Sequence, residues 1–241
     1  HTGRRRTARF LAEGPNVVEA ALRRELVVEV FVTEDALARF GSMLGAAPVR
    51  LIWVNSPANP TGRVLSVEQL RAIVDWARDR GAIVASDECY LELGWEPDAA
   101  PISILHPSVC GRSQDGLLAV HSLSKRSNLP GLRVGFAAGD RRFLARYVEL
   151  RNIAAPQVPV PMQEVAIAAY AEEAHVEKNR ELYVAKFDLA DQIVGDRYGY
   201  KRPAGGFFLW LDVSSKGTDE AIAMRLWREG GLRVIPGHYL A

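Results

Sequence analysis

Cysteine is scarce in this sequence, with Cys89 and Cys110 as the only two among 241 residues. Two cysteines cannot build the disulfide framework of a small secreted fold, and so low a number is typical of a reducing cytosol. Long apolar runs are also lacking, so neither a membrane span nor the apolar core of a signal peptide can be recognised. The sequence therefore predicts a cytoplasmic protein with no membrane partner.

An excess of one charge is missing as well, because 30 basic residues face 29 acidic ones and leave a net charge of +1. This balance argues against a generally nucleic-acid-binding surface, although local patches remain open. The patterns GxGxxG, HExxH and CxxC do not occur, which leaves nicotinamide and zinc chemistry without support and predicts no metal site. Hydrophobic residues make up 48% of the chain, enough for one large α/β domain or two smaller ones.

The most informative stretch covers residues 121–135 and reads HSLSKRSNLPGLRVG. It lies between two apolar segments that are typical of strands, residues 117–121 and 134–138. Lys125 thus follows a strand end, where α/β sheets place reactive groups, and a lysine there can form a Schiff base with a carbonyl cofactor. The plain alternative is that Lys125 and Arg133 are solvated loop charges. A place near the site is open for His121, but it is expected to be a strand-end histidine with its hydrogen bonds satisfied.

Two upstream stretches also follow predicted strands. The first, VNSPANPTG over residues 54–62, comes after the apolar run 49–54. The second, SDECY over residues 86–90, comes after the strand-like segment 82–86. Taken alone, Asp87 could be a strand-end turn residue and Tyr90 a core aromatic.

In this order and spacing, NPTG, DxxY, SxSK and GLRVG resemble the class I/II aminotransferases, which use pyridoxal phosphate (PLP) and have the type I fold. The resemblance covers about residues 46–241. Within it, NSPANPTGRVL, SDECY and LLAVHSLSKRSNL look most like the succinyldiaminopimelate aminotransferases of lysine biosynthesis. It implies amino transfer between an amino acid, with N-succinyl-diaminopimelate as a candidate, and a 2-oxo acid, by a homodimer.

The resemblance also implies roles for individual residues. Lys125 would bind PLP covalently and then move the substrate's α-proton. Asp87 would pair with the pyridine nitrogen and keep it protonated, so that the ring accepts electrons. Asn59 and Tyr90 would donate hydrogen bonds to the phenolic oxygen of the ring.

The phosphate of the cofactor would be held by Ser122 and by Arg133, whose guanidinium suits that anion. Ser124, from the same SxSK motif, completes the implied cofactor-binding set. Three parts of the family's site find no match: the first phosphate loop, the aromatic that stacks on the ring, and the arginine for the substrate carboxylate. Arg233 precedes the last PG turn and is not a replacement for that arginine, so the sequence predicts impaired activity for this chain.

Strands that alternate with helices predict a mostly parallel sheet flanked by helices, an incomplete type I large domain, followed by a smaller α+β part. The predicted domains are residues 1–45, 46–150 and 151–241. Ser66 and Gln69 form a capping box for a helix over residues 67–80, with Gly81 after its end. Further helices are expected at 141–152, 162–171, 174–195 and 221–228, and further strands at 207–211 and 232–235.

The first forty residues have a different character. Their sequence, which includes RRRTARFLAEGPNVVEAAL, resembles the substrate-binding domain that precedes RNA 2′-O-ribose methyltransferase domains. An RNA-binding module in which Arg4, Arg5, Arg6 and Arg9 contact phosphates is therefore the alternative function. An ordinary charged terminus explains the same arginines, and no methyltransferase domain follows. A strand over 26–32 and an N-cap at Thr33 are expected here.

Overall fold

The computed structural model describes residues 29–31, 49–96, 100–154 and 157–240. The chain divides into two compact units. The large unit covers residues 50–212, and the second unit combines residues 1–49 with residues 213–241. The residues predicted to bind PLP all belong to the large unit.

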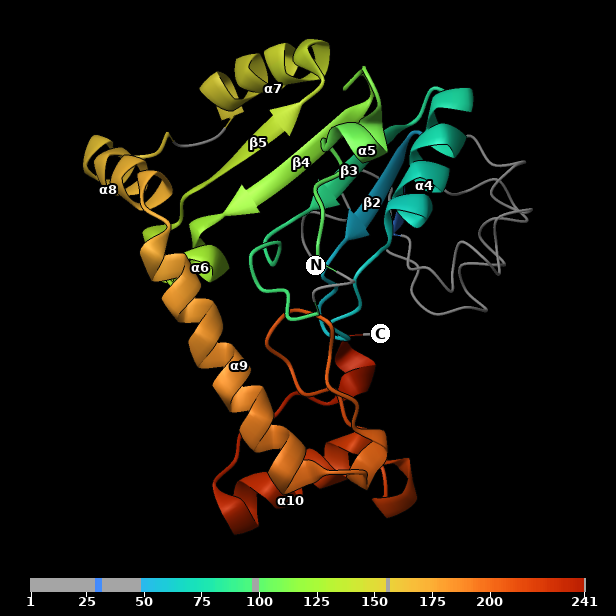
Figure 1. Cartoon of the computed structure of the whole chain (residues 1–241), viewed down its shortest axis with the longest axis vertical. Coiled ribbons are helices and arrows are strands. Elements are labelled where there is room, and N and C mark those ends of the chain that lie inside the picture. Colours follow the sequence, from blue (N-terminus) through green and yellow to red (C-terminus); the bar gives the residue numbers. More distant parts are fainter. Residues whose placement is uncertain (1–28, 32–48, 97–99, 155–156, 241) are drawn as a thin grey trace. The chain divides into compact units, whose positions relative to one another are not determined.

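The large unit is built on four neighbouring strands, seen side by side in Figure 1. They are β2 (Leu51–Asn55), β3 (Ile83–Asp87), β4 (Leu117–Ser122) and β5 (Gly135–Gly139). β2 pairs with β3, and β3 with β4, in parallel, whereas β5 runs antiparallel to β4. The expected mostly parallel sheet is confirmed, and the strand boundaries differ from the predicted ones by one or two residues.

Helix α4 (Val67–Asp79) forms as its sequence signals predict. The Ser66 side chain accepts a hydrogen bond from the Gln69 backbone at 3.3 Å, and the Gln69 side chain accepts one from the Ser66 backbone at 2.7 Å. This capping box satisfies backbone N–H groups that the first turn leaves unpaired. Gly81 follows the end of the helix with φ = 63°. The buried face consists of four apolar residues at helical spacing, Leu70, Ile73, Val74 and Ala77.

Helix α7 (Arg141–Ala154) follows β5 and is capped by Asp140. The Asp140 carboxylate accepts hydrogen bonds from the backbone N–H groups of Arg142 and Phe143, at 2.7 and 3.0 Å. Its second oxygen accepts from the N–H of Gly116, which precedes β4, at 2.8 Å. One buried side chain therefore fixes both the start of α7 and the start of β4.

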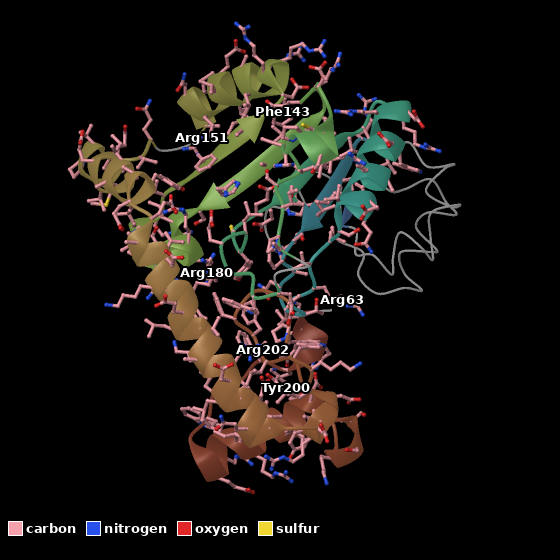
Figure 2. All side chains as sticks on the ribbon, in the orientation of Figure 1. Arg63, Phe143, Arg151, Arg180, Tyr200 and Arg202 are labelled. Atoms are coloured by element: carbon pink, nitrogen blue, oxygen red, sulfur yellow. The ribbon has the colours of Figure 1, made fainter. Side chains whose placement is uncertain are left out.

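Two more long helices follow, α8 (Val160–Ala171) and α9 (Ala174–Val194), and α9 leads away from the sheet (Figure 1). The short elements of the unit are α5 (Pro107–Cys110), α6 (Leu123–Arg126), η2 (Pro130–Leu132) and η3 (Arg197–Gly199). Near the end of α9, Tyr200 and Arg202 lie close together in Figure 2. Both donate hydrogen bonds to the carboxylate of Asp191, at 2.6 and 2.8 Å, and thereby lower its pKa.

The predicted buried strand at residues 207–211 is wrong. Within the described chain this segment pairs with no strand, and Leu209 and Trp210 are 47% and 42% exposed. Only an isolated antiparallel bridge between Gly94 and Gly205 forms nearby. A strand needs a partner for its backbone groups, and an apolar pattern does not supply one.

The described part of the second unit contains β1 (Glu29–Phe31), η4 (Ser214–Lys216), α10 (Asp219–Gly230) and η5 (Gly237–Tyr239). β1 falls inside the strand expected at 26–32, whereas the expected cap at Thr33 lies outside the described residues. Residues 232–235, predicted as the last strand, have no regular structure, and Ile235 is 65% exposed. Asp219 opens α10 and accepts hydrogen bonds from the backbone and the ring of His238.

Candidate active site at the carboxyl edge of the sheet

Three parallel strands deliver the predicted site residues to one edge of the sheet. The register pairs Asn55 with Asp87, and Asp87 with Val120, so β2, β3 and β4 end side by side. The loops that follow them carry the NPTG, DxxY and SxSK motifs. Ligands of open α/β sheets bind outside the carboxyl ends of strands, which makes this edge the candidate site.

Asn55, at the end of β2, connects two of these loops and was not singled out from the sequence. Its side-chain amide donates a hydrogen bond to the Asp87 carbonyl at 3.0 Å. Its side-chain oxygen accepts one from the backbone N–H of Asn59 at 2.7 Å. Asn55 thus holds the NPTG loop against the end of β3. The signal available in the sequence was an asparagine directly after an apolar strand, since its side chain can both donate and accept hydrogen bonds.

The turn after β3 is organised by Asp87. Its carboxylate accepts a hydrogen bond from the backbone N–H of Cys89 at 3.1 Å. Burial, followed by the contact with Asp87, raises the pKa of the Cys89 thiol to about 12, while the charge of Lys125 acts in the opposite direction. Burial also raises the pKa of Tyr90 to about 12, with further contributions from Cys89, Asp87 and Tyr183. At neutral pH the phenol of Tyr90 therefore keeps its proton and can donate it in a hydrogen bond.

Ser122 starts the short helix that carries Lys125. Its hydroxyl accepts a hydrogen bond from the Ser124 backbone at 3.1 Å and lies 2.9 Å from the Ser124 hydroxyl. Both serines of the SxSK motif thus take part in capping α6. The carbonyl of Lys125 accepts a hydrogen bond from the side chain of Asn179 on α9, at 3.3 Å.

Arg126, next to Lys125, fixes the same short helix from its other side. The side chain is buried and donates hydrogen bonds to the Ala169 carbonyl, at 2.9 Å, and to Glu173. Its guanidinium also lies 5.4 Å from the centre of the Tyr170 ring. A four-residue helix has little stability of its own, so these contacts hold the backbone of Lys125 in place.

The amine of Lys125 lies against an aromatic wall. Its Nζ atom is 4.6 Å from the centre of the Phe207 ring and 6.0 Å from that of Tyr90. Phe207 stacks on Tyr183 of α9, with 5.4 Å between ring centres and 15° between planes. Phe207 and Tyr183 were not identified from the sequence. The GGFF segment offered a signal, but it was interpreted as a turn that leads into a buried strand.

The predicted residues do not all meet. Asp87 and Lys125 both act on the pKa of the Cys89 thiol, and the Lys125 amine lies 6.0 Å from the centre of the Tyr90 ring. Asn59 and Arg133 are exposed, and within the described chain no hydrogen bond joins either of them to Lys125. The guanidinium of Arg133 donates to the Pro130 carbonyl at 2.8 Å, and its backbone has φ = 57°.

Comparison with known proteins now decides the family. The family described as "Aminotransferase class I and II" matches residues 30–241. This chain belongs to that family. Its members depend on PLP, as the four motifs implied. The match begins before residue 46, where the motif resemblance starts, so residues 30–45 also lie within the family match.

Curated relatives agree with this assignment. The 4-dedimethylamino-4-oxo-anhydrotetracycline transaminase OxyQ of Streptomyces rimosus is 46% identical over 197 residues, covering 81% of this chain and 54% of OxyQ. The probable aminotransferase Rv1178 of Mycobacterium tuberculosis is 42% identical, with 85% and 47% covered. An LL-diaminopimelate aminotransferase of Aquifex aeolicus is 29% identical, with 80% and 49% covered. The chain thus spans about half the length of the curated relatives it matches.

Solved structures show the same fold. An aminotransferase from Neisseria meningitidis superposes with a TM-score of 0.74 at 37% identity, covering 87% of this chain and 51% of that one. The aminotransferase AspB of Helicobacter pylori gives 0.72 at 32% identity, with 87% and 52% covered. The large unit is therefore the core of a type I fold that is incomplete in this chain.

Two further resemblances expected from the sequence are not supported. The resemblance of residues 1–40 to RNA methyltransferases finds no support in these comparisons, and the family match already includes residues 30–40. A special likeness to the succinyldiaminopimelate enzymes is not shown either, since the relatives at 46% and 42% identity carry other names.

The residues present at this edge fit PLP. Lys125 supplies an amine for the aldehyde, and its surroundings of Tyr90 and Phe207 suit a flat ring. Asp87 supplies a carboxylate on the neighbouring strand end.

In the described part of the chain, no cluster of His, Cys, Asp or Glu could hold a metal ion. Among the described residues, no helix is long and apolar enough to span a membrane.

Proposed function

We propose that this chain carries the catalytic lysine of a PLP-dependent aminotransferase, which moves an amino group between an amino acid and a 2-oxo acid. The observation that carries the proposal is the position of the Lys125 amine, which lies against the rings of Phe207 and Tyr90 and acts, together with Asp87, on the Cys89 thiol. Family membership over residues 30–241 supports the same reaction class.

Each residue has a part that its chemistry allows. PLP, when bound, supplies a ring that accepts electrons from the substrate. Lys125 holds the cofactor by its Nζ atom and, once released, moves the α-proton of the substrate as a general base. The carboxylate of Asp87 keeps a proton on the pyridine nitrogen. Tyr90, whose phenol stays protonated, donates a hydrogen bond to the phenolic oxygen of the ring.

The remaining residues bind rather than react. Asn59 donates a second hydrogen bond to the phenolic oxygen. Ser122, Ser124 and Arg133 hold the phosphate through hydroxyl and guanidinium donors. Asn59 and Arg133 are exposed, which leaves both side chains accessible to a bound cofactor.

For the substrate, we propose N-succinyl-diaminopimelate as the amino donor, which would place the protein in lysine biosynthesis. The support is the sequence of the NPTG, SDECY and SLSK segments, together with the LL-diaminopimelate aminotransferases among the relatives.

We also propose a cytoplasmic homodimer. Sedimentation of the purified protein tests the dimer.

Steady-state transamination tests the function directly. The purified protein is assayed with PLP, 2-oxoglutarate as the amino acceptor and three amino donors: N-succinyl-diaminopimelate, LL-diaminopimelate and aspartate. We expect N-succinyl-diaminopimelate to give the highest kcat/KM, and Lys125→Ala to abolish turnover. Lys178→Ala, which removes an exposed lysine on α9, is the matched control and should keep the wild-type rate. Turnover that survives Lys125→Ala contradicts the proposal, and a preference for another donor contradicts only the substrate.

A further inference from the structure

A buried carboxylate that the proposed reaction does not use lies directly after Asp87. Glu88 is only 2% exposed. One of its oxygens accepts a hydrogen bond from the backbone N–H of Ile104 at 2.8 Å, and the other lies 2.8 Å from Nε2 of His121. Its own backbone N–H donates to the Val120 carbonyl at 2.9 Å. Burying a carboxylate costs free energy unless its oxygens accept hydrogen bonds, and these contacts offset that cost for Glu88.

His121 is held equally firmly on its other side. Its ring stacks on Phe136 of β5, with 4.8 Å between ring centres and 10° between planes. Phe136 in turn meets the ring of Tyr170 on α8 edge to face, at 5.3 Å. The imidazole thus has one orientation, between Glu88 and Phe136. The next residue, Ser122, caps the helix that carries Lys125.

We propose that Glu88 and His121 are positioning residues that hold the ends of β3 and β4 together and thereby place Asp87 opposite Lys125. The inference rests on the proposed function, because it assigns the pair to the same site. The paired ladder between β3 and β4 ends at Asp87 and Val120. Beyond it, the side-chain contact of Glu88 with His121 continues the connection between the two strand ends.

Placement matters at this point because a shift of about 1 Å in a catalytic group can lower a rate by about a hundredfold. A role in folding alone would also explain a buried Glu–His contact, so the test needs a measurement that a general loss of stability leaves unchanged. Cys89, the residue after Glu88, provides it. Its thiol pKa is raised to about 12 by burial and by Asp87. Because the thiolate is the reactive form, the thiol reacts slowly as long as the turn is held.

Four variants separate the roles. Glu88→Ala removes both contacts of the carboxylate, and His121→Phe removes the polar contact while keeping a ring on Phe136. Glu88→Gln is the conservative variant, since its amide can accept from Ile104 and donate to a neutral imidazole. Asp140→Ala is the control, because it removes another buried, hydrogen-bonded carboxylate at the opposite end of β4.

Alkylation of Cys89 by iodoacetamide is followed by peptide mass spectrometry in protein without added PLP, at temperatures equally far below each melting point. Relative to Asp140→Ala, we expect Glu88→Ala and His121→Phe to react roughly tenfold faster, because each loses a hydrogen bond to a charged group. Glu88→Gln should remain near the wild type. Equal rates in all variants would overturn the inference, and His121→Phe remains informative if Glu88→Ala does not fold.

A PLP titration monitored by absorbance links the pair to the site. The two disruptive variants should bind PLP roughly tenfold more weakly than Asp140→Ala, while Glu88→Gln binds as the wild type does. Faster alkylation with unchanged PLP affinity would show that the pair orders the turn but does not place the site residues, which also overturns the inference. If the wild type itself binds no PLP at Lys125, the proposed function fails, and the alkylation result still decides whether the pair holds the strand ends.

Discussion

At the scale of single residues, the candidate site consists of a lysine and the aromatic side chains around its amine. Lys125 lies against Phe207 and Tyr90, and Phe207 is supported by Tyr183. The sequence allowed Lys125 and Tyr90 to be predicted because they belong to short motifs. It could not reveal Phe207 or Tyr183, because Phe207 comes close to Lys125 only when the segment after α9 folds back against Tyr183 of α9 and Tyr90.

Tyr90→Phe tests the role of the phenol at this scale. The ring keeps its edge-to-face contacts with Phe207 and Phe208, at 5.4 and 5.8 Å, so the melting temperature should change little. Loss of one hydrogen bond to bound PLP should weaken cofactor affinity about fivefold, corresponding to about 1 kcal/mol. Affinity is measured by absorbance titration with PLP. Unchanged affinity together with a lower melting temperature would mean that Tyr90 is merely a core aromatic.

At the scale of helices and strands, the sequence predicted those features that depend only on residues close together in the chain. The capping box of α4 and the glycine after α4 form as predicted, and the helix expected at residues 141–152 is present as α7, with Asp140 as its cap. The strands predicted at residues 207–211 and 232–235 do not form, because strand formation depends on a partner that lies elsewhere in the chain. The antiparallel direction of β5 was equally invisible, since an apolar segment of five residues carries no sign of direction.

Asp140→Ala gives a prediction for the start of α7. Hydrogen bonds from Gly116, Phe143 and Arg142 lower the pKa of Asp140, so the folded state favours its ionised form. Removing the cap should lower the free energy of unfolding by about 1 kcal/mol at pH 7.

The pH dependence of this effect follows from the direction of the shift. A group with a lowered pKa stabilises the fold fully above its unfolded-state value, about 4, and loses that contribution as the pH falls through its folded-state value. The difference between wild type and Asp140→Ala should therefore be constant at neutral pH and shrink below about pH 4. Urea unfolding over this range measures it. A difference that stays the same in acid would show that the carboxylate charge plays no part.

At the scale of the whole chain, the family match and the fold indicate the same class of protein, although the chain spans only about half the length of its relatives. The family match extends over residues 30–241, and the TM-scores of 0.74 and 0.72 place the chain in the aminotransferase fold. The family could be predicted from four short segments, because these motifs occur in the order and spacing that are typical of it. The substrate was harder to predict, because the relatives at 46% and 42% identity carry names other than that of the succinyldiaminopimelate enzymes.

The central claim is that Lys125 is the residue that binds PLP. The most direct measurement is reduction of the PLP-treated protein with borohydride, followed by mapping of the modified peptide by mass spectrometry. The account predicts a stable pyridoxyl group on Lys125 in the wild type and in Lys178→Ala, and none in Lys125→Ala. Modification spread over several exposed lysines, or unchanged labelling after Lys125→Ala, would contradict it.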